Sequence, residues 1–396
     1  MSPASRGESW ASTARDLYLV AMAVFLVTVS IGVVNGLDLV APSHDVLLTH
    51  VHSGTLGWLS LGIVATAGWL YRASDRPMAV ALIVLVPIYV AAFASGNLAA
   101  KAIGGVLLMA AILWLVVWAW QSFLASERSV PGLALVLALT TFTYGAIIGV
   151  LLQVQFATGA TWLSGDAIGS HAGAMVFAYL VLAAMGIVEW RLRETRGRPR
   201  GGVVQVAALF VGGLVLSLGL LVGAAQAAGG IYLLVTLIAI VLFTVRVVPA
   251  AVRAPWADPG PGRQFAVASL WIVVAVAIYL YLVSQFITSG GDTAAINLNV
   301  LVASDHATFV GVMTNVLLGL VATIAPIRRS ASSWLHHLQF WAMNLGLAAF
   351  AVGLIVDSAV IKRLGAPVMG IAILLGLALL APRLWASRGD PAPADA

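Results

Sequence analysis

Apolar stretches of about 20 residues recur along the whole chain, and each is long enough to cross a lipid bilayer as an α-helix. Hydrophobic residues make up 61% of the sequence and charged residues only 9%. Soluble domains carry about 25% charged residues, so this composition is that of a chain embedded in lipid. The sequence therefore predicts an all-α integral membrane protein, with no role in nucleic-acid binding despite its net charge of +5.

The apolar runs predict twelve transmembrane helices. They cover residues 17–38, 50–71, 77–95, 100–124, 131–155, 168–190, 203–223, 229–249, 265–287, 304–326, 334–356 and 365–384. The transmembrane domain then spans 17–384, between an N-terminal tail at 1–16 and a C-terminal tail at 385–396. No cleavable signal peptide is expected, because the first apolar run is too long and lacks a cleavage site.

The basic residues support this number of helices. Cytoplasmic loops of membrane proteins carry an excess of Arg and Lys. With the N-terminus in the cytoplasm, all of the 20 basic residues fall on the cytoplasmic side except Lys101, Lys362 and Arg363. An extra or missing helix would scramble this distribution. We therefore expect cytoplasmic N- and C-termini, a multi-pass location in the inner (cytoplasmic) membrane, and the lipid bilayer as the main partner.

Histidines lie near the start of three predicted helices. They are His52 in HVHSGTLGWLSLGIVATAGWLY, His171 in SHAGAMVFAYLVLAAMGIVEW and His306 in DHATFVGVMTNVLLGLVATIAP. These even-numbered helices run from the outside to the inside, so the three histidines and His50 are all expected near the outer face. Each lies within the first turn or two of its predicted helix, which suggests equivalent positions.

Neutral imidazole is a common ligand of haem iron and copper, and ionisable groups at membrane depth usually have a function. The pattern predicts a haem or metal site near the outer face, with His52, His171 and His306 as candidate metal ligands. The alternative is that each histidine is a polar residue at headgroup level. The chain has no cysteine, which excludes thiolate ligands, iron–sulfur clusters and covalently attached haem.

His50 and His52 lie about 200° apart around a helix, so only one of them can face a given site. His52 is the preferred ligand, because Gly54 and Gly57 on the same helix would let a flat macrocycle approach the backbone.

Several other polar residues have a structural interpretation. Asp45, Asp166 and Asp305 flank the histidines; they can accept a hydrogen bond from an imidazole or cap a helix, and capping is preferred for Asp166 and Asp305. His336 and His337, beside Trp334, are expected at the inner interface, away from the outer histidines. The same reading assigns a surface ion pair to Glu189, with Arg191 or Arg193 as its partner.

Twelve helices with histidines on the second, sixth and tenth resemble subunit I of the haem–copper oxidase superfamily. The HVHSGTLGW stretch is similar to the second helix of divergent C-family-like and nitric-oxide-reductase-like members. The resemblance implies three four-helix arcs and a low-spin haem ligated by His52 and His306, with His50 as the alternative on the second helix. It also implies that His171 ligates a second metal, copper.

The sequence departs from that superfamily at its reaction centre. The predicted seventh helix, VVQVAALFVGGLVLSLGLLVG, has no histidine, and the tenth has only His306. The binuclear oxygen-reducing centre is therefore incomplete, and a functional terminal oxidase is not expected. The chain is also similar in architecture to NnrS-like proteins, which are associated with haem, copper and nitric oxide stress. These resemblances imply a non-covalent b-type haem, an oxidoreductase-like role in redox or nitric oxide chemistry, and a membrane or periplasmic electron donor.

Two other functions fit parts of the pattern. A polytopic transporter would suit the helix number and the many glycines, although transporters place their binding groups near the middle of the membrane. A membrane protein with copper but no haem would use His52, His171 and His306 as one site. An optical spectrum of the purified protein separates these classes.

The topology can be tested with reporter fusions. Fusions after Ala160 and Ala295 are expected to report an outside location, and fusions after Gly197 and Asp258 an inside location. An inside signal at Ala160 would break the twelve-helix topology and place His171 on the opposite side from His52.

Overall fold

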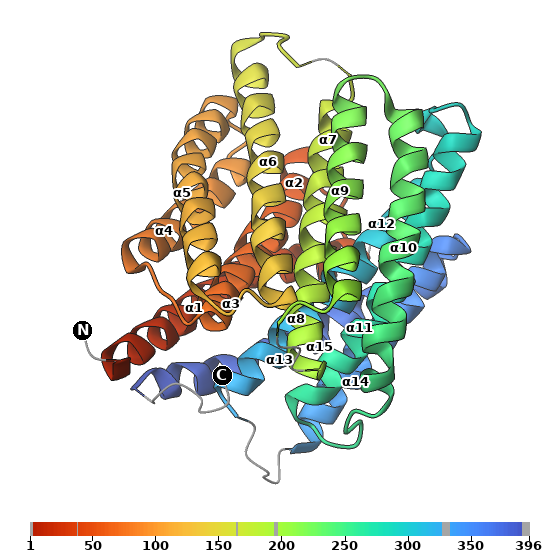
Figure 1. Cartoon of the computed structure of the whole chain (residues 1–396). Helices are drawn as coiled ribbons and strands as arrows, with labels where there is room; N and C mark the ends of the chain where they lie inside the picture. Colours follow the sequence, from red (N-terminus) through yellow and green to blue (C-terminus); the bar gives the residue numbers. More distant parts are fainter. Residues whose placement is uncertain (1–2, 38, 164, 194–196, 327–332, 390–396) are drawn as a thin grey trace. The chain divides into compact units, whose positions relative to one another are not determined.

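The structure is a computed structural model that describes the whole chain except residues 1–2, 38, 164, 194–196, 327–332 and 390–396. Within the described residues every regular element is helical, and no strand is present (Figure 1). The predicted all-α class is therefore confirmed.

Fifteen α-helices make up most of the described chain. Their bounds are α1 Pro3–Gly36, α2 His44–His52, α3 Leu61–Tyr71, α4 Arg76–Ala94, α5 Leu98–Ala125, α6 Val130–Thr158, α7 Ala167–Gly173, α8 Leu182–Arg193, α9 Arg200–Leu221, α10 Ala225–Val252, α11 Pro261–Thr288, α12 Leu298–His306, α13 Asn315–Ile324, α14 Ser333–Ile355 and α15 Ala359–Ala386. Three π-helices join pairs of them: η1 Ser53–Ser60, η2 Ala174–Val181 and η4 Ala307–Thr314. Two short 3₁₀-helices are η3 Thr293–Ala295 and η5 Ser387–Gly389.

Among the described residues, eleven helical segments are long and apolar enough to cross a membrane. The segment formed by α2, η1 and α3, where the second span was predicted, is not among the eleven. Many large apolar side chains are exposed on these helices, such as Val245 at 71% and Leu234 at 63%. Exposed apolar surface on this scale is typical of helices that contact lipid, and the structure is that of a multi-pass membrane protein.

Some helices begin earlier than the sequence predicts. The first was expected from residue 17, but α1 begins at Pro3, and Trp10 and Arg15 are buried. Trp10 stacks on Trp69 with ring centroids 6.1 Å apart, which explains why this part of the expected tail packs as helix. The second was expected from residue 50, but α2 begins at His44, after Ser43, whose hydroxyl accepts from the Val46 N–H.

The chain divides into two compact units. Unit 1 comprises residues 1–96, 254–268 and 309–396, and unit 2 comprises residues 97–253 and 269–308. The chain passes from one unit to the other inside α11 and inside η4.

In unit 1, glycines bring α14 and α15 into close contact. A side chain on Gly346 would meet the Met369 backbone nitrogen at 2.6 Å, and one on Gly365 would meet the Phe350 nitrogen at 2.5 Å. Small residues at such contacts let two helix backbones approach, which is the usual packing of helices in lipid.

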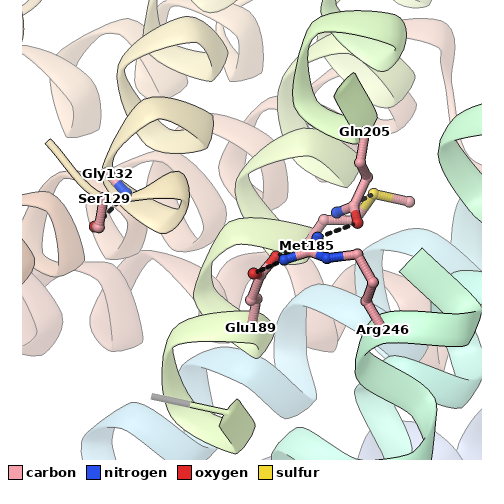
Figure 2. A network of polar contacts seen from close by, with 6 residues as sticks. All are labelled: Ser129, Gly132, Met185, Glu189, Gln205 and Arg246. Atoms are coloured by element: carbon pink, nitrogen blue, oxygen red, sulfur yellow. Dashed lines mark hydrogen bonds and ion pairs between the residues drawn. The ribbon is translucent and has the colours of Figure 1, made fainter. Parts of the chain in front are cut away.

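In unit 2, a buried ion pair links three helices (Figure 2). Arg246 of α10 donates to both carboxylate oxygens of Glu189 on α8, and also to Gln205 Oε1 on α9 at 2.7 Å. The Glu189 side chain is fully buried, and that of Arg246 is 13% exposed. The expectation of a surface ion pair between Glu189 and a neighbouring arginine is therefore wrong, because α10 supplies the partner from its own buried face.

Removing this carboxylate should destabilise the protein strongly. Glu189→Ala would leave the Arg246 guanidinium buried without its counter-charge, a change that costs about 3–5 kcal/mol. Asp357→Ala is the control: it breaks the Lys362–Asp357 pair, in which the aspartate side chain is 75% exposed, and exposed pairs contribute about 0–1 kcal/mol. Thermal unfolding of both variants in detergent checks the difference, and equal melting temperatures would contradict it.

Candidate functional site

A π-helix lies in each of the three segments that carry His50 and His52, His171, and His306. η1, η2 and η4 are each eight residues long. π-helical turns are rare and concentrate at functional sites. In η1 the wide turn is visible in two bonds that reach back five residues: from the Leu61 N–H to the Leu56 carbonyl, and from Ser60 Oγ to the Thr55 carbonyl at 2.8 Å.

The segments that contain η2 and η4 are the most enclosed of the candidate spans. In the apolar window of Leu298–Ile324 89% of the residues are buried, and in that of Ala167–Arg193 72% are buried, against 33–61% for the other nine. Irregular backbone at membrane depth is tolerated where protein covers it, which fits the position of these π-helices.

The π-helices define which histidines are equivalent. His52 and His306 are each the last residue of a nine-residue α-helix, and a π-helix begins at the next residue. His50 and His171 instead lie three residues before η1 and η2. The expected equivalence of His52, His171 and His306 is therefore corrected: His52 corresponds to His306, and His50 corresponds to His171. His52 and His306 are also more than two turns into their helices, deeper than expected.

His50 and His171 make matching contacts with the helix that precedes theirs. His50 Nδ1 is 2.9 Å from the carbonyl oxygen of Thr28 on α1. His171 Nδ1 is 2.8 Å from the carbonyl oxygen of Gly145 on α6. Both imidazoles are thus held by a backbone group of a neighbouring helix within their own unit.

A glycine makes room for each of these two imidazoles. A Cβ on Gly32 would lie 3.0 Å from His50 Cε1, and a Cβ on Gly149 would lie 2.7 Å from His171 Cε1. Each glycine follows the accepting carbonyl by four residues, in FLVTVSIG (25–32) and FTYGAIIG (142–149). This repeated F-x-x-[TG]-x-x-x-G pattern is a sequence signal for the two sites that the analysis of the histidines alone missed.

The phenylalanines of this pattern also have matching partners. Phe25 stacks on Trp58 of η1 with ring centroids 4.9 Å apart. Phe142 packs against Tyr179 of η2 with centroids 4.8 Å apart. Both aromatic partners occupy the sixth position of their π-helices. The segment around His50 and the segment around His171 therefore share the same contacts at the aromatic residues as well as at the histidine.

The third segment, which contains η4, has a serine in place of the imidazole. Ser304 lies three residues before η4, where the other copies have His50 and His171, and its hydroxyl is 3.4 Å from the Ala275 carbonyl on α11. Tyr279 lies four residues after Ala275, the position that Gly32 and Gly149 hold in the other two segments. This segment therefore has a serine where the others have histidine, and a tyrosine where the others have glycine.

His52 and His306 are held in a different way, by their own helices. His52 Nδ1 is 2.8 Å from the Leu48 carbonyl, and His306 Nδ1 is 2.9 Å from the Val302 carbonyl, in each case four residues earlier. The His52 ring also stacks on Phe93 of α4, with centroids 3.7 Å apart and planes 15° apart. This contact fixes the orientation of the His52 ring.

These contacts define which tautomer each of the four imidazoles adopts when it is neutral. A carbonyl oxygen only accepts hydrogen bonds, so each neutral ring must carry its proton on Nδ1. The lone pair then lies on Nε2, which is the form in which histidine binds a metal or haem iron, with the other nitrogen anchored by a hydrogen bond.

Backbone carbonyls, and not aspartates, are the acceptors of these Nδ1 bonds. Asp166 is the N-cap of α7, where its Oδ1 accepts from the Gly169 N–H at 2.7 Å, so the preferred capping role is confirmed. Asp305 is the second-last residue of α12, and the helix is capped instead by Asn297, so capping by Asp305 is wrong.

The glycines expected to leave room for a macrocycle serve helix packing. A side chain on Gly54 would meet Thr28 Cγ2 at 3.1 Å, and one on Gly57 would meet Val24 Cγ1 at 2.2 Å. Both glycines therefore face α1 and let it approach η1, so they give no support to His52 as the haem ligand. That support comes from its Nδ1 contact and its position before η1.

The two remaining candidate histidines lie elsewhere in unit 1. His336 is buried, and His337 Nδ1 is 2.7 Å from Arg263 Nη1, so both are part of a polar cluster. Within the described ranges, no three His, Asp or Glu side chains form a group that could hold a metal ion. No known family model and no curated protein matches the chain.

The protonation state can be measured by NMR of protein with nitrogen-15-labelled histidine. His171 is expected to show a protonated Nδ1 and an unprotonated Nε2. Gly149→Ala should shift His171 toward the other tautomer, because the new methyl group would displace the ring from the Gly145 carbonyl. Gly230→Ala, where a Cβ meets nothing within 4 Å, is the control. Identical His171 signals in all three proteins would contradict the assignment.

Proposed function

We propose that the protein is a haem-binding integral membrane protein of the haem–copper oxidase-like fold, with a role in redox or nitric oxide chemistry. His52 and His306 would hold one non-covalent, b-type haem. The incomplete set of histidines argues against oxygen reduction at a binuclear centre.

One observation carries this proposal. His52 and His306 share a position directly before a π-helix, and each directs Nδ1 to the carbonyl four residues earlier. Two rings with the same anchoring bond would be the same tautomer, which supports their assignment as two like ligands.

Each part of the chain has a definite task in such a site. The Leu48 and Val302 carbonyls hold the Nδ1 protons and keep the lone pairs on Nε2. The Phe93 ring stacked on His52 limits rotation of that ligand. The haem iron would supply reversible one-electron chemistry, and a gas such as nitric oxide would bind only by displacing one of the two histidines.

A copper ion is the second proposed cofactor, with His171 as its ligand. The support is the carbonyl of Gly145 and the space at Gly149, which together hold this imidazole as a neutral ligand. His50 has the same arrangement in unit 1. A protein that binds copper and no haem is therefore the second candidate function.

We further propose twelve spans in three groups of four, with both termini in the cytoplasm and the protein in the inner membrane. The position of the π-helices supports the grouping. If the segment of α2, η1 and α3 is counted as a span, a π-helix lies in the second, sixth and tenth spans along the chain.

The optical spectrum tests the haem ligands. The purified protein should show a Soret band and contain at most one haem per chain. His52→Ala and His306→Ala should each abolish the band, because loss of either Nε2 removes an axial ligand, and added imidazole should restore it in part. His44→Ala is the matched control on α2, since His44 is an exposed residue in the first turn of that helix.

Three results would count against the proposal. A normal Soret band in His306→Ala would remove this residue from the site. Bound copper without any Soret band would favour the copper-only function. Two haems per chain with sustained oxygen consumption would show an intact oxygen-reducing centre.

A further inference from the structure

A cluster of basic and amide side chains lies in unit 1, separate from the histidines discussed above. It forms where α11 and α14 begin and α15 ends. Its members are Arg263, Gln264, His336, His337, Gln339 and Arg383.

Contacts within the cluster hold Arg263 in place. Its Nη1 is 2.7 Å from His337 Nδ1, and its Nη2 donates to the His336 carbonyl oxygen at 2.7 Å. The guanidinium also lies over the Phe340 ring, 4.4 Å from its centroid. None of these partners is a carboxylate, and Arg263 is only 1% exposed.

Three nitrogen atoms of the cluster are buried and have no hydrogen-bond partner: Arg263 Nε, His336 Nε2 and Arg383 Nη1. Arg263 and Arg383 both act electrostatically on the His336 ring. The C-terminal half of α15 reaches the cluster, because a Cβ on Gly376 would lie 3.3 Å from Gln339 Cδ. An unpartnered buried donor is costly, so such groups normally bind something.

The charge of the cluster indicates what it binds. It contains two guanidinium groups, and the carboxylate that acts on Arg263 is Asp258, in the loop before α11. The helix N-termini of α11 and α14 add positive potential at the same place. Among the described residues, two arginines with one carboxylate leave a positive charge, and Arg263 is buried, so an anion would be favourable here.

We propose that this cluster is a binding site for a phosphate-type oxyanion. Donors from α11, α14 and α15 suit a group with several oxygen atoms, and arginine is well matched to phosphate. Gln264 Oε1, which is buried and has no partner, can accept from a protonated phosphate oxygen. The same chemistry is present in free phosphate and in the headgroup of an anionic phospholipid.

The test uses the full-length protein, freed of lipid in a neutral detergent. Inorganic phosphate should raise the melting temperature relative to chloride at equal ionic strength, and titration should give its affinity. Arg383→Gln should weaken phosphate binding on the order of tenfold, because one charged donor is lost. Arg383→Lys, which keeps the charge, should lose less and covers the case in which Arg383→Gln does not fold.

The control is Arg388→Gln, which removes the same charge nearby but from a surface pair with Asp16. It should bind phosphate as the wild type does. A second arm compares vesicles of phosphatidylcholine with vesicles containing phosphatidylglycerol: stabilisation by the anionic lipid but not by inorganic phosphate identifies the headgroup as the source. No stabilisation by either, or equal stabilisation of wild type and Arg383→Gln, would overturn the site and leave ordered water as the partner of these donors.

Discussion

Backbone hydrogen bonding in lipid is the constraint on which this structure depends. A peptide group in the hydrocarbon core has no water to bond, so a spanning segment must satisfy its own N–H and C=O groups as a helix. Each π-helix is a departure from the regular pattern. η2 and η4 lie in the two candidate spans that protein covers most fully. The two most enclosed candidate spans are thus ones in which the backbone adopts a π-helix just after a histidine.

The backbone also explains how the histidine rings are oriented. A backbone carbonyl already bonded within its helix has a second lone pair. Here such a carbonyl accepts a hydrogen bond from each imidazole Nδ1–H. No further polar side chain needs to enter the membrane to orient the ring. His50 and His171 take this bond from the preceding helix, whereas His52 and His306 take it from their own. Both kinds of imidazole site therefore depend on the same interaction, a hydrogen bond from Nδ1–H to a backbone carbonyl.

The buried charged groups elsewhere in the structure differ in their partners. The Glu189 carboxylate is fully buried and receives two bonds from Arg246, with Gln205 completing the group. Arg263 has neutral partners instead, His337 and the His336 carbonyl. The first group satisfies its charges internally and links α8, α9 and α10. The cluster around Arg263 keeps buried donors without a hydrogen-bond partner, so it suggests a bound ligand, whereas the Glu189–Arg246 group does not.

The sequence by itself determined the helical class and the membrane setting, because hydropathy and the length of apolar runs depend only on local composition. It also identified His52, His171 and His306 as the histidines of interest. Only the tertiary structure decided that His52 corresponds to His306 and His50 to His171, since π-helices depend on how segments pack. It likewise paired Glu189 with Arg246, turned Gly54 and Gly57 toward α1, and placed Asp305 away from a helix cap. Such partners are set by contacts between residues distant along the chain, and local patterns do not contain them.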